Sequence, residues 1–370
     1  MGTRSLRILH ITSSLGIGGA EAVLYNLVKH LNKDAEHIVI TFYDGPYGER
    51  LRACGIRVFV LRGFFFLYDP TFFMRLLWRV KQLQPDCIHS LLWAANIVAR
   101  IIGWALGIPV ISAMHNNVSL NGRLRNCLDS WTMPLAKQIV VIHEGVRQSI
   151  IDRCRKHERL SINIIHNCID IDDVQDLANT NLQLRNSFGL REDHFVIGAV
   201  GRWISIKRYS LLIEQFAYIL HHYTHARLIL VGHGQQENVL REQVRMLGID
   251  HAVRFIVGKQ AYGYFPLFNC FVLPSITEGP AIALLEAMSF GLPCVVTHEE
   301  SDHPVIVSGK NGILVSVFDA DALYTALMKL ITNSYLSKSL GIHARQTIRR
   351  DFSIDRMVAA YKKIFYESMW

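Results

Sequence analysis

Charged residues, proline and cysteine are all scarce in this sequence of 370 residues. Only 19% of the residues are charged and 50% are hydrophobic, whereas an intrinsically disordered chain has many charges and few apolar residues. The 10 prolines and 25 glycines are too few for a collagen-like or low-complexity chain. These shortages favour a folded protein, and the chain length favours two domains.

The cysteines give no sign of a disulfide framework or a zinc cluster. Seven is an odd number, and no two of them form a C-x-x-C pair. Most lie in apolar runs, where a free cysteine acts as a small hydrophobic residue. They are Cys54, Cys87, Cys127, Cys154, Cys168, Cys270 and Cys294. The pattern predicts free thiols and fits a reducing cytosol best.

Long hydrophobic runs are missing as well. The strongest candidate for a membrane span, residues 101–114, is interrupted by Gly103, Gly107 and Pro109, and it is shorter than the about twenty residues that a span needs. The apolar run at residues 8–11 leads into a glycine-rich loop and not into a cleavage site, so we expect no signal peptide.

Short apolar runs alternate with amphipathic segments along most of the chain. The runs predict strands at 6–12, 38–42, 58–61, 87–91, 110–114, 138–142, 195–200, 227–231, 253–257, 270–273 and 293–297. Helical spacing predicts helices between them at 19–31, 70–83, 94–106, 208–221, 235–247 and 280–289, with two further helices ending the chain. Alternation of this kind is typical of parallel sheets covered by helices on both faces.

The alternation pauses near residues 162–176 and then restarts. It therefore predicts two doubly wound domains, with limits at 1–170 and 171–352, and a C-terminal helix at 353–370 that packs back on the first domain. Ligands of open α/β sheets bind at the carboxyl ends of the strands. Side chains directly after strands are therefore the candidates for function.

Two such positions lie in the first half. Gly18 and Gly19 belong to a glycine-rich loop that leads from the first strand into a helix, where backbone N–H groups can approach an anion. Glu21 replaces the third glycine of a dinucleotide fingerprint, and a tight turn is the alternative. His115 follows the strand at 110–114 and can contact a sugar or phosphate, although a lone histidine at a strand end is more often structural.

In the second half, Arg202 and Lys207 flank a loop between a strand and a helix. Two cations there suit a diphosphate, and two solvated surface cations are the alternative. Gly232 and Gly234 follow the next strand and allow a nucleotide to approach the backbone closely.

The most specific pattern is Glu278-Gly279 followed eight residues later by Glu286. If the whole segment were helical, the two carboxylates would be about 12 Å apart along the axis, which is more than a glycosidase pair needs. Glu286 lies in an apolar stretch, so its carboxylate should be paired or bound to a ligand. Two contacts to one long ligand are favoured over a helix-terminal Glu and a surface Glu.

Asp170 and Asp172 form a D-x-D sequence, which can be a metal motif. They lie in the predicted linker and not after a core strand, so we expect a solvated linker and no metal site.

Taken together, these motifs resemble those of the large retaining glycosyltransferase family 4. The resemblance covers nearly the whole chain, and the combination is far more specific than any single motif. Its carriers are Gly18-Gly19-Ala20-Glu21, Gly201-Arg202 with Lys207, Val231-Gly232-x-Gly234, and Pro274-Ser275 through Glu278-Gly279 and Leu284-Leu285-Glu286-Ala287 to Gly291-Leu292-Pro293. It implies the GT-B fold, with two doubly wound Rossmann-like domains facing a cleft.

The resemblance also implies roles. The first domain would bind the acceptor and the second a nucleotide sugar, without metal or cofactor. Catalysis would fall to His115, Arg202, Lys207 and Glu278. Donor binding would fall to Gly18, Gly19, Arg202, Lys207, Gly232, Gly234, Glu278, Gly279 and Glu286, of which Glu278 would contact the sugar and Glu286 the ribose. Several residues depart from the family pattern: Cys168, Arg208, His233, Asn269 and Pro304.

The formal net charge of +8 is not evenly distributed. Residues 50–159 contain sixteen Lys and Arg against six Asp and Glu, so the excess belongs to the first domain. Aromatic and basic residues alternate at 62–81, which predicts docking on an anionic membrane. An amphipathic helix with its apolar face in the core is the alternative.

The resulting hypothesis is a cytoplasmic enzyme on the inner face of the cell membrane. It would move a hexose, with UDP as the expected carrier, to a lipid-linked or surface-glycan acceptor in bacterial surface-polysaccharide biosynthesis. A GT-B nucleotide-sugar epimerase is the nearest alternative. A nucleic-acid-binding protein would leave the strand-end motifs unexplained, and a nicotinamide oxidoreductase needs a complete glycine fingerprint.

Overall fold

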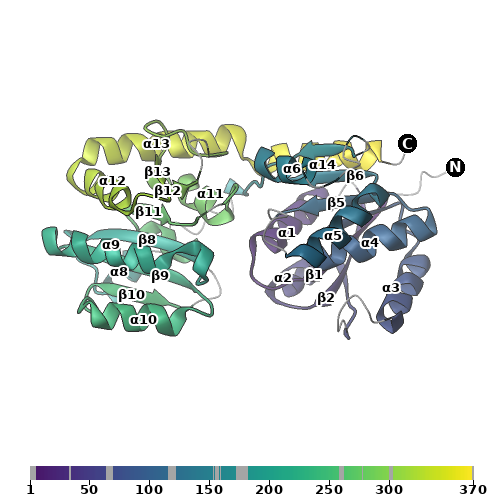
Figure 1. The fold of residues 1–370 in the computed structure, drawn as a ribbon, viewed down its shortest axis with the longest axis horizontal. Coiled ribbons are helices and arrows are strands. Elements are labelled where there is room, and N and C mark those ends of the chain that lie inside the picture. The colour runs from purple at the N-terminus through teal and green to yellow at the C-terminus, as the bar shows by residue number, and fades with distance from the viewer. Residues whose placement is uncertain are drawn as a thin grey trace. The chain divides into compact units, whose positions relative to one another are not determined.

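The computed structural model describes residues 6–32, 35–63, 70–115, 122–152, 154, 158, 160–171, 182–257, 262–276, 278–299 and 303–368. The chain divides into two compact units. Unit 1 comprises Met1–Cys168 with Ile354–Trp370, and unit 2 comprises Ile169–Ser353. Each unit is a parallel sheet with helices on its faces (Figure 1).

The sheet of unit 1 has seven parallel strands in the order β3-β2-β1-β4-β5-β6-β7. The strand order reverses beside β1, as in doubly wound folds. The strands are β1 (Arg7–Ser14), β2 (Glu36–Tyr43), β3 (Arg57–Val60), β4 (Cys87–Leu91), β5 (Val110–Met114), β6 (Gln138–Val141) and β7 (Ile162–Ile164).

The helices of unit 1 bury apolar stripes against this sheet. In α3, residues Phe72, Leu76, Val80 and Leu83 are buried, and this spacing of three to four residues places them on one side of the helix. The helix α14 packs on α1 in this unit. The helices are α1 (Gly19–Leu31), α2 (Pro46–Ala53), α3 (Pro70–Leu83), α4 (Trp93–Leu106), α5 (Arg123–Thr132), α6 (Glu144–Ile151) and α14 (Ile354–Glu367).

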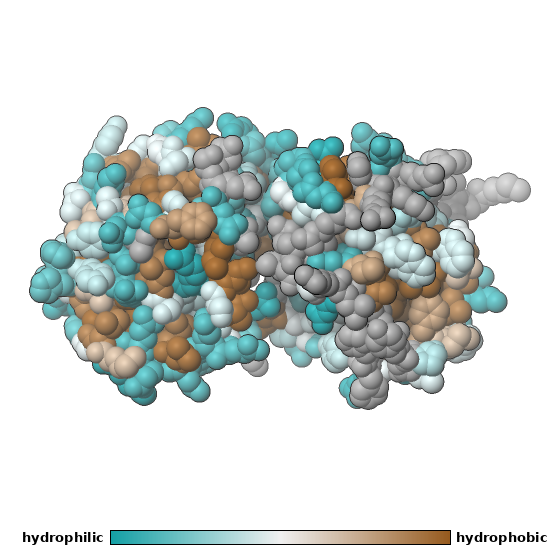
Figure 2. All heavy atoms as spheres, viewed as in Figure 1, coloured by the Kyte–Doolittle hydropathy of each residue, from teal (hydrophilic) through white to brown (hydrophobic). Residues whose placement is uncertain are grey.

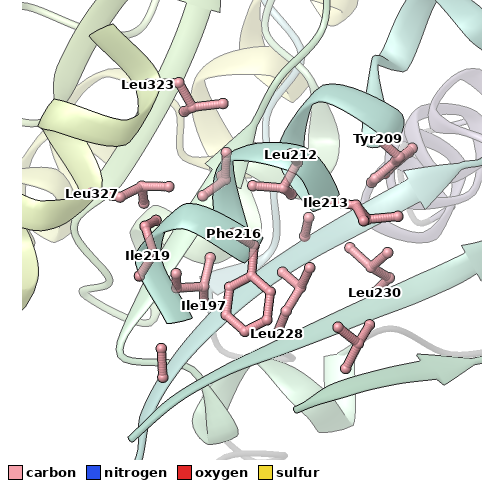
Figure 3. Close-up of a cluster of buried hydrophobic side chains, with 14 of the residues drawn as sticks. Ile197, Tyr209, Leu212, Ile213, Phe216, Ile219, Leu228, Leu230, Leu323 and Leu327 are labelled. Atoms are coloured by element: carbon pink, nitrogen blue, oxygen red, sulfur yellow. The ribbon is translucent and has the colours of Figure 1, made fainter. Parts of the chain in front are cut away.

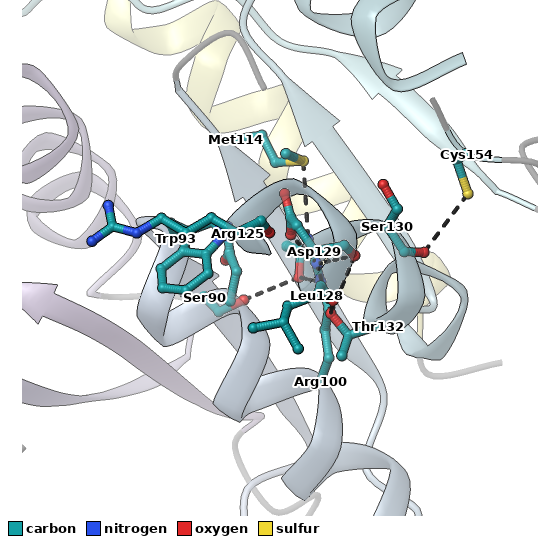
Figure 4. A network of polar contacts seen from close by, with 12 residues as sticks. Ser90, Trp93, Arg100, Met114, Arg125, Leu128, Asp129, Ser130, Thr132 and Cys154 are labelled. Atoms are coloured by element: carbon teal, nitrogen blue, oxygen red, sulfur yellow. Dashed lines mark hydrogen bonds and ion pairs between the residues drawn. The ribbon is translucent and has the colours of Figure 1, made fainter. Parts of the chain in front are cut away.

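A buried polar network ties α4 and α5 to the strand β5 (Figure 4). Arg100 of α4 is fully buried and forms an ion pair with Asp129 of α5 at 2.6 Å. Its Nε donates a hydrogen bond to the Ser112 hydroxyl of β5 at 2.9 Å. The network thus holds β5, which precedes residues 115–122, and α5, which follows them.

Unit 2 has six parallel strands in the order β10-β9-β8-β11-β12-β13. The strands are β8 (Phe195–Arg202), β9 (Ala226–His233), β10 (Val253–Ile256), β11 (Cys270–Leu273), β12 (Cys294–His298) and β13 (Ile313–Ser316). The helices are α8 (Leu182–Ser187), α9 (Tyr209–His222), α10 (Glu237–Met246), α11 (Ile282–Ser289), α12 (Ala320–Thr332) and α13 (Ser334–Asp351), with 3-10 turns η4 (Ser205–Lys207) and η5 (Tyr262–Leu267).

The core of unit 2 lies between α9, α12 and the strands (Figure 3). Phe216 and Ile219 of α9 pack with Leu228 of β9 and with Leu327 of α12, and all four side chains are buried. Each side chain of this size contributes about 1.5–3 kcal/mol when it is removed from water. The core thus holds α9 over the sheet.

The predicted fold class is confirmed, since both units are doubly wound α/β layers. The helices at 19–31 and 70–83 and the strands at 87–91, 110–114 and 270–273 have the predicted bounds. The prediction of two final helices is wrong, because β13 and three helices, α12, α13 and α14, follow residue 298. The seven cysteines are free thiols, as predicted, and five of them are buried.

Candidate active site

Two loops meet at the carboxyl ends of the neighbouring strands β8 and β11 in unit 2. The first follows Arg202, the last residue of β8, and contains η4, and the second runs from Pro274 toward α11. The backbone N–H of Ile276 donates to the carbonyl oxygen of Ile206 at 2.9 Å, which joins the loops directly. The predicted residues Lys207 and Glu278 lie on these two loops.

Lys207 and Glu278 are in contact. The Lys207 ammonium forms an ion pair with Oε1 of Glu278, and their side chains are 14% and 25% exposed. The Ser275 hydroxyl donates to the other carboxylate oxygen, Oε2, at 2.9 Å. Burial and the Glu278 charge raise the pKa of the nearby Tyr209, which therefore stays a neutral phenol. Lys207 and Ser275 together hold both carboxylate oxygens of Glu278 in place.

Gly232, near the end of β9, and Gly234, directly after it, allow two backbones to approach each other. A side chain at Gly232 would collide with the carbonyl oxygen of Gly201, and one at Gly234 would collide with the backbone of Trp203. The Trp203 N–H donates to the carbonyl oxygen of His233 at 2.8 Å. Glycine is therefore required here for contact between the loops that follow β8 and β9.

The other predicted residues of unit 2 differ in exposure. Arg202 is exposed at the end of β8, and it has no ion-pair partner among the residues that the structure describes. Glu286 is 5% exposed within α11. Because α11 begins at Ile282, the segment from Glu278 to Glu286 is helical only in its second half. The separation of about 12 Å between the two carboxylates, calculated for a fully helical segment, therefore does not apply. Gly279 lies between β11 and α11.

Gly18 and Gly19 lie in unit 1 at the start of α1. Gly18 is the N-cap residue and makes no side-chain cap bond, and Glu21 lies in the first turn of the helix. The preceding loop is held to the start of α2, since the Tyr47 backbone N–H donates to the carbonyl oxygen of Leu15 at 3.1 Å. Backbone N–H groups at the N-terminus of a helix such as α1 are suited to an anion.

His115 directly follows β5 in unit 1. Burial lowers the pKa of His115 to about 4, and a contact with the Asn167 side chain acts in the opposite direction. At neutral pH the ring is therefore uncharged, and it can donate or accept a hydrogen bond but adds no positive charge. His115 shares unit 1 with the glycine loop, whereas Arg202, Lys207, Glu278 and Glu286 belong to unit 2.

Three further buried histidines form a chain across unit 1. His10 Nδ1 lies 3.0 Å from His89 Nδ1, His10 Nε2 lies 2.9 Å from His37 Nδ1, and His37 Nε2 lies 3.2 Å from the Leu31 carbonyl oxygen. Since the carbonyl can only accept, His37 Nε2 carries a proton. Neutral rings then require His10 Nε2–H and His89 Nδ1–H as the donors. The Phe365 ring of α14 packs on His10 and His89.

One expectation about the linker changes with the structure. Asp170 is buried, so the expectation of a solvated linker is wrong at this residue, while Asp172 lies outside the described residues. The sequence patterns did not assign a role to Ser275. Its place three residues before Glu278, as in S-x-x-E capping boxes, is the signal that could have identified it.

Within the described ranges, no group of three or more His, Cys, Asp or Glu side chains is arranged to hold a metal ion. No helix in those ranges is long and apolar enough to cross a membrane.

The sequence matches two protein families. Residues 17–173 match "Glycosyltransferase Family 4", and residues 181–347 match "Glycosyl transferases group 1". The putative glycosyltransferase EpsF of Bacillus subtilis (strain 168) is 22% identical over 310 residues, which is 80% of each chain. An Escherichia coli UDP-Gal:alpha-D-GlcNAc-diphosphoundecaprenol alpha-1,3-galactosyltransferase is 22% identical over 307 residues, 78% of this chain and 77% of that one.

The fold has solved counterparts. Anabaena HepE, crystallised in complex with UDP-glucose, superposes with a TM-score of 0.83 at 20% identity, over 98% of this chain and 100% of that one. Together the two family matches span most of the chain. It therefore belongs to the glycosyltransferases of the family 4 type with a GT-B fold, and it is a transferase enzyme.

Proposed function

We propose that the protein transfers a hexose from a nucleotide sugar, with UDP as the carrier, to a lipid-linked or surface-glycan acceptor, with retention of the anomeric configuration. The observation that carries this proposal is the meeting of Lys207, Glu278 and Ser275 at the carboxyl ends of β8 and β11. The relatives support the reaction class, since the E. coli enzyme is a galactosyltransferase acting on a diphosphoundecaprenol-linked sugar. HepE binds UDP-glucose.

In the proposed reaction the donor's diphosphate becomes more negative as the bond to the sugar breaks. The exposed Arg202 offers a planar fork of donors, and Lys207 offers a compact charge. Both stabilise the departing diphosphate, a task that a metal ion performs in other transferases. Glu278 accepts hydrogen bonds from hydroxyls of the transferred sugar, and Glu286 accepts them from the ribose.

The glycines position the donor in this proposal. Gly232, Gly234 and Gly279 let the nucleotide approach the backbone. Gly18 and Gly19 present backbone N–H groups at the start of α1, which bind phosphates or the acceptor. His115, neutral at the working pH, contacts the sugar through a hydrogen bond.

We propose further that unit 1 docks peripherally on the anionic inner face of the cell membrane, in surface-polysaccharide biosynthesis. The apolar side of α3 is buried, but Met74 and Trp78 on its outer side are 60% and 58% exposed. Arg75 and Arg79 accompany them, and hydrophobic residues lie exposed among hydrophilic ones on this part of unit 1 (Figure 2). Part of the predicted segment, residues 64–69, lies outside the described residues.

The test is transfer by the purified protein from a panel of radiolabelled UDP- and GDP-sugars to a membrane extract. We expect label in the lipid or glycan fraction with one donor, and loss of that label in Glu278→Gln. NMR of the product reports the anomeric configuration, and inversion contradicts retention. Conversion of the donor without any acceptor would favour an epimerase and contradict the proposal.

A further inference from the structure

Ser275 is a buried side chain for which the proposed reaction has no role yet. It lies two residues after β11 and is 1% exposed. Its hydroxyl donates to Oε2 of Glu278 at 2.9 Å, because an ionised carboxylate can only accept. A hydrogen bond to a charged group contributes more than one between neutral groups.

Ser275 is itself held from the next strand and the neighbouring loop. The Thr297 hydroxyl of β12 donates to the carbonyl oxygen of Ser275 at 2.6 Å, and Thr297 is also buried. The following residue, Ile276, is bonded to Ile206 through the backbone. Two elements thus fix the position from which the Ser275 hydroxyl reaches Glu278.

Lys207 and Ser275, the two partners of Glu278, differ in whether a bound donor would also engage them. Lys207 holds Oε1, but in the proposed function its ammonium is also needed by the diphosphate. Ser275 holds Oε2 from a buried position and has no such second task. A bound donor therefore removes one restraint from Glu278 and leaves the other.

We propose that Ser275 is a positioning residue that keeps the Glu278 carboxylate in one orientation while Lys207 turns from Glu278 to the donor's phosphates. The inference rests on the proposed function, in which Glu278 contacts the sugar and not the nucleotide. Ser275 should therefore affect the binding of a nucleotide sugar and not that of the nucleotide alone. A purely structural serine would affect both equally.

The experiment measures the affinities of UDP-glucose and UDP by calorimetry. In Ser275→Ala we expect about tenfold weaker binding of UDP-glucose, the usual effect of one lost bond to a charged group, and unchanged binding of UDP. Ser275→Thr keeps the hydroxyl and should restore most of the affinity. Ser368→Ala is the matched control, because it removes a buried serine hydroxyl that donates to the Ile364 carbonyl oxygen in unit 1.

A double-mutant cycle with Glu278→Gln completes the test. If Ser275 acts through Glu278, Ser275→Ala adds no further loss in that background. A full additional loss, or equal losses for UDP and UDP-glucose, would overturn the inference. A wild-type protein that binds neither UDP- nor GDP-sugars contradicts the proposed function itself, whereas normal donor binding by Ser275→Ala contradicts only the role of Ser275.

Discussion

Lys207 and Glu278, 71 residues apart in the sequence, form an ion pair at the carboxyl ends of β8 and β11. Neither side chain is more than one quarter exposed, so the pair is only partly screened by solvent. In the proposed function, a donor diphosphate competes with Glu278 for the Lys207 ammonium. The residue predicted to bind the diphosphate and the residue predicted to bind the sugar are thus in contact with each other.

We expect Lys207→Ala to lower transfer by about 10²–10³-fold, since a placed charge on the departing group is lost. Glu278 keeps its bond to Ser275, so the fold should persist. Initial rates and melting temperatures of the variant check both points. The control is Arg245→Ala, which breaks the exposed pair with Glu242 in the same unit and should leave the rate unchanged. Full transfer in Lys207→Ala would contradict the site.

Arg208, one of the residues that depart from the family pattern, has a backbone conformation that favours glycine. Arg208 has a φ of 50°, in the left-handed region, which costs a non-glycine residue about 1–2 kcal/mol. Its guanidinium donates to the carbonyl oxygen of Val317 at 2.7 Å, a bond that offsets about 1 kcal/mol of this cost.

From this balance we expect Arg208→Gly to change the free energy of unfolding by less than about 1 kcal/mol. Arg208→Ala should be less stable than Arg208→Gly by about 1 kcal/mol, because it loses the bond and keeps the strain. Urea unfolding of the two variants provides the comparison. Equal stability of the two would mean that the left-handed backbone carries no cost here.

The sequence predicted best where elements are held by continuous apolar surface. The strand at 87–91 is buried along its whole length, and α3 shows its apolar stripe directly. The helix α5 was missed because what holds it in place is polar: Asp129 pairs with the buried Arg100, and hydrophobic periodicity cannot show such a contact. In α2 only Gly48 and Leu51 are buried, although Pro46 at its start was a usable signal.

In the site, the sequence located the loops but not the contacts within them. Arg202, Lys207, Glu278 and Glu286 were predicted as candidates because side chains after parallel strands share one edge. The pairing of Lys207 with Glu278 depends on side-chain geometry across two loops. No spacing along the chain encodes that pairing.

The buried pair of Arg100 and Asp129 leads to a prediction about stability. We expect Arg100→Met or Asp129→Leu alone to destabilise the protein by about 3–5 kcal/mol, because each leaves one buried charge without its partner. The double variant should recover most of this loss. Denaturant unfolding of the three variants measures it. If the double variant loses as much stability as the two single variants together, the pair contributes more to stability than each charge neutralising the other.

The buried histidines make the stability of unit 1 depend on pH. Burial lowers the pKa of His89 to about 3, and the charges of His115 and His37 act in the same direction. In the unfolded chain the pKa is about 6.5, so between these values only the unfolded chain binds the proton. The free energy of unfolding should therefore fall by about 1.4 kcal/mol per pH unit for this residue as the pH drops below about 6.5.

His89→Asn keeps a donor for His10 but cannot take up a proton. The free energy of unfolding should therefore depend less steeply on pH, by the about 1.4 kcal/mol per pH unit that His89 contributes. The control is His343→Gln on α13, where the histidine is exposed and the slope should not change. Unfolding in urea at pH 5 and pH 7.5 gives the slopes. An unchanged slope in His89→Asn contradicts the assignment of a buried neutral ring.

Membrane docking through α3 predicts sedimentation of the protein with phosphatidylglycerol vesicles at low salt and much less with phosphatidylcholine. Trp78→Ala removes an interfacial side chain, and Arg75→Gln removes a charge worth about 1 kcal/mol near an anionic surface. Each should weaken binding about fivefold or more. Tyr335→Ala is the matched control, since Tyr335 is an exposed aromatic residue of α13 in unit 2. A protein that ignores anionic vesicles at low salt has no such docking surface, and the exposed Met74 and Trp78 would then need another partner.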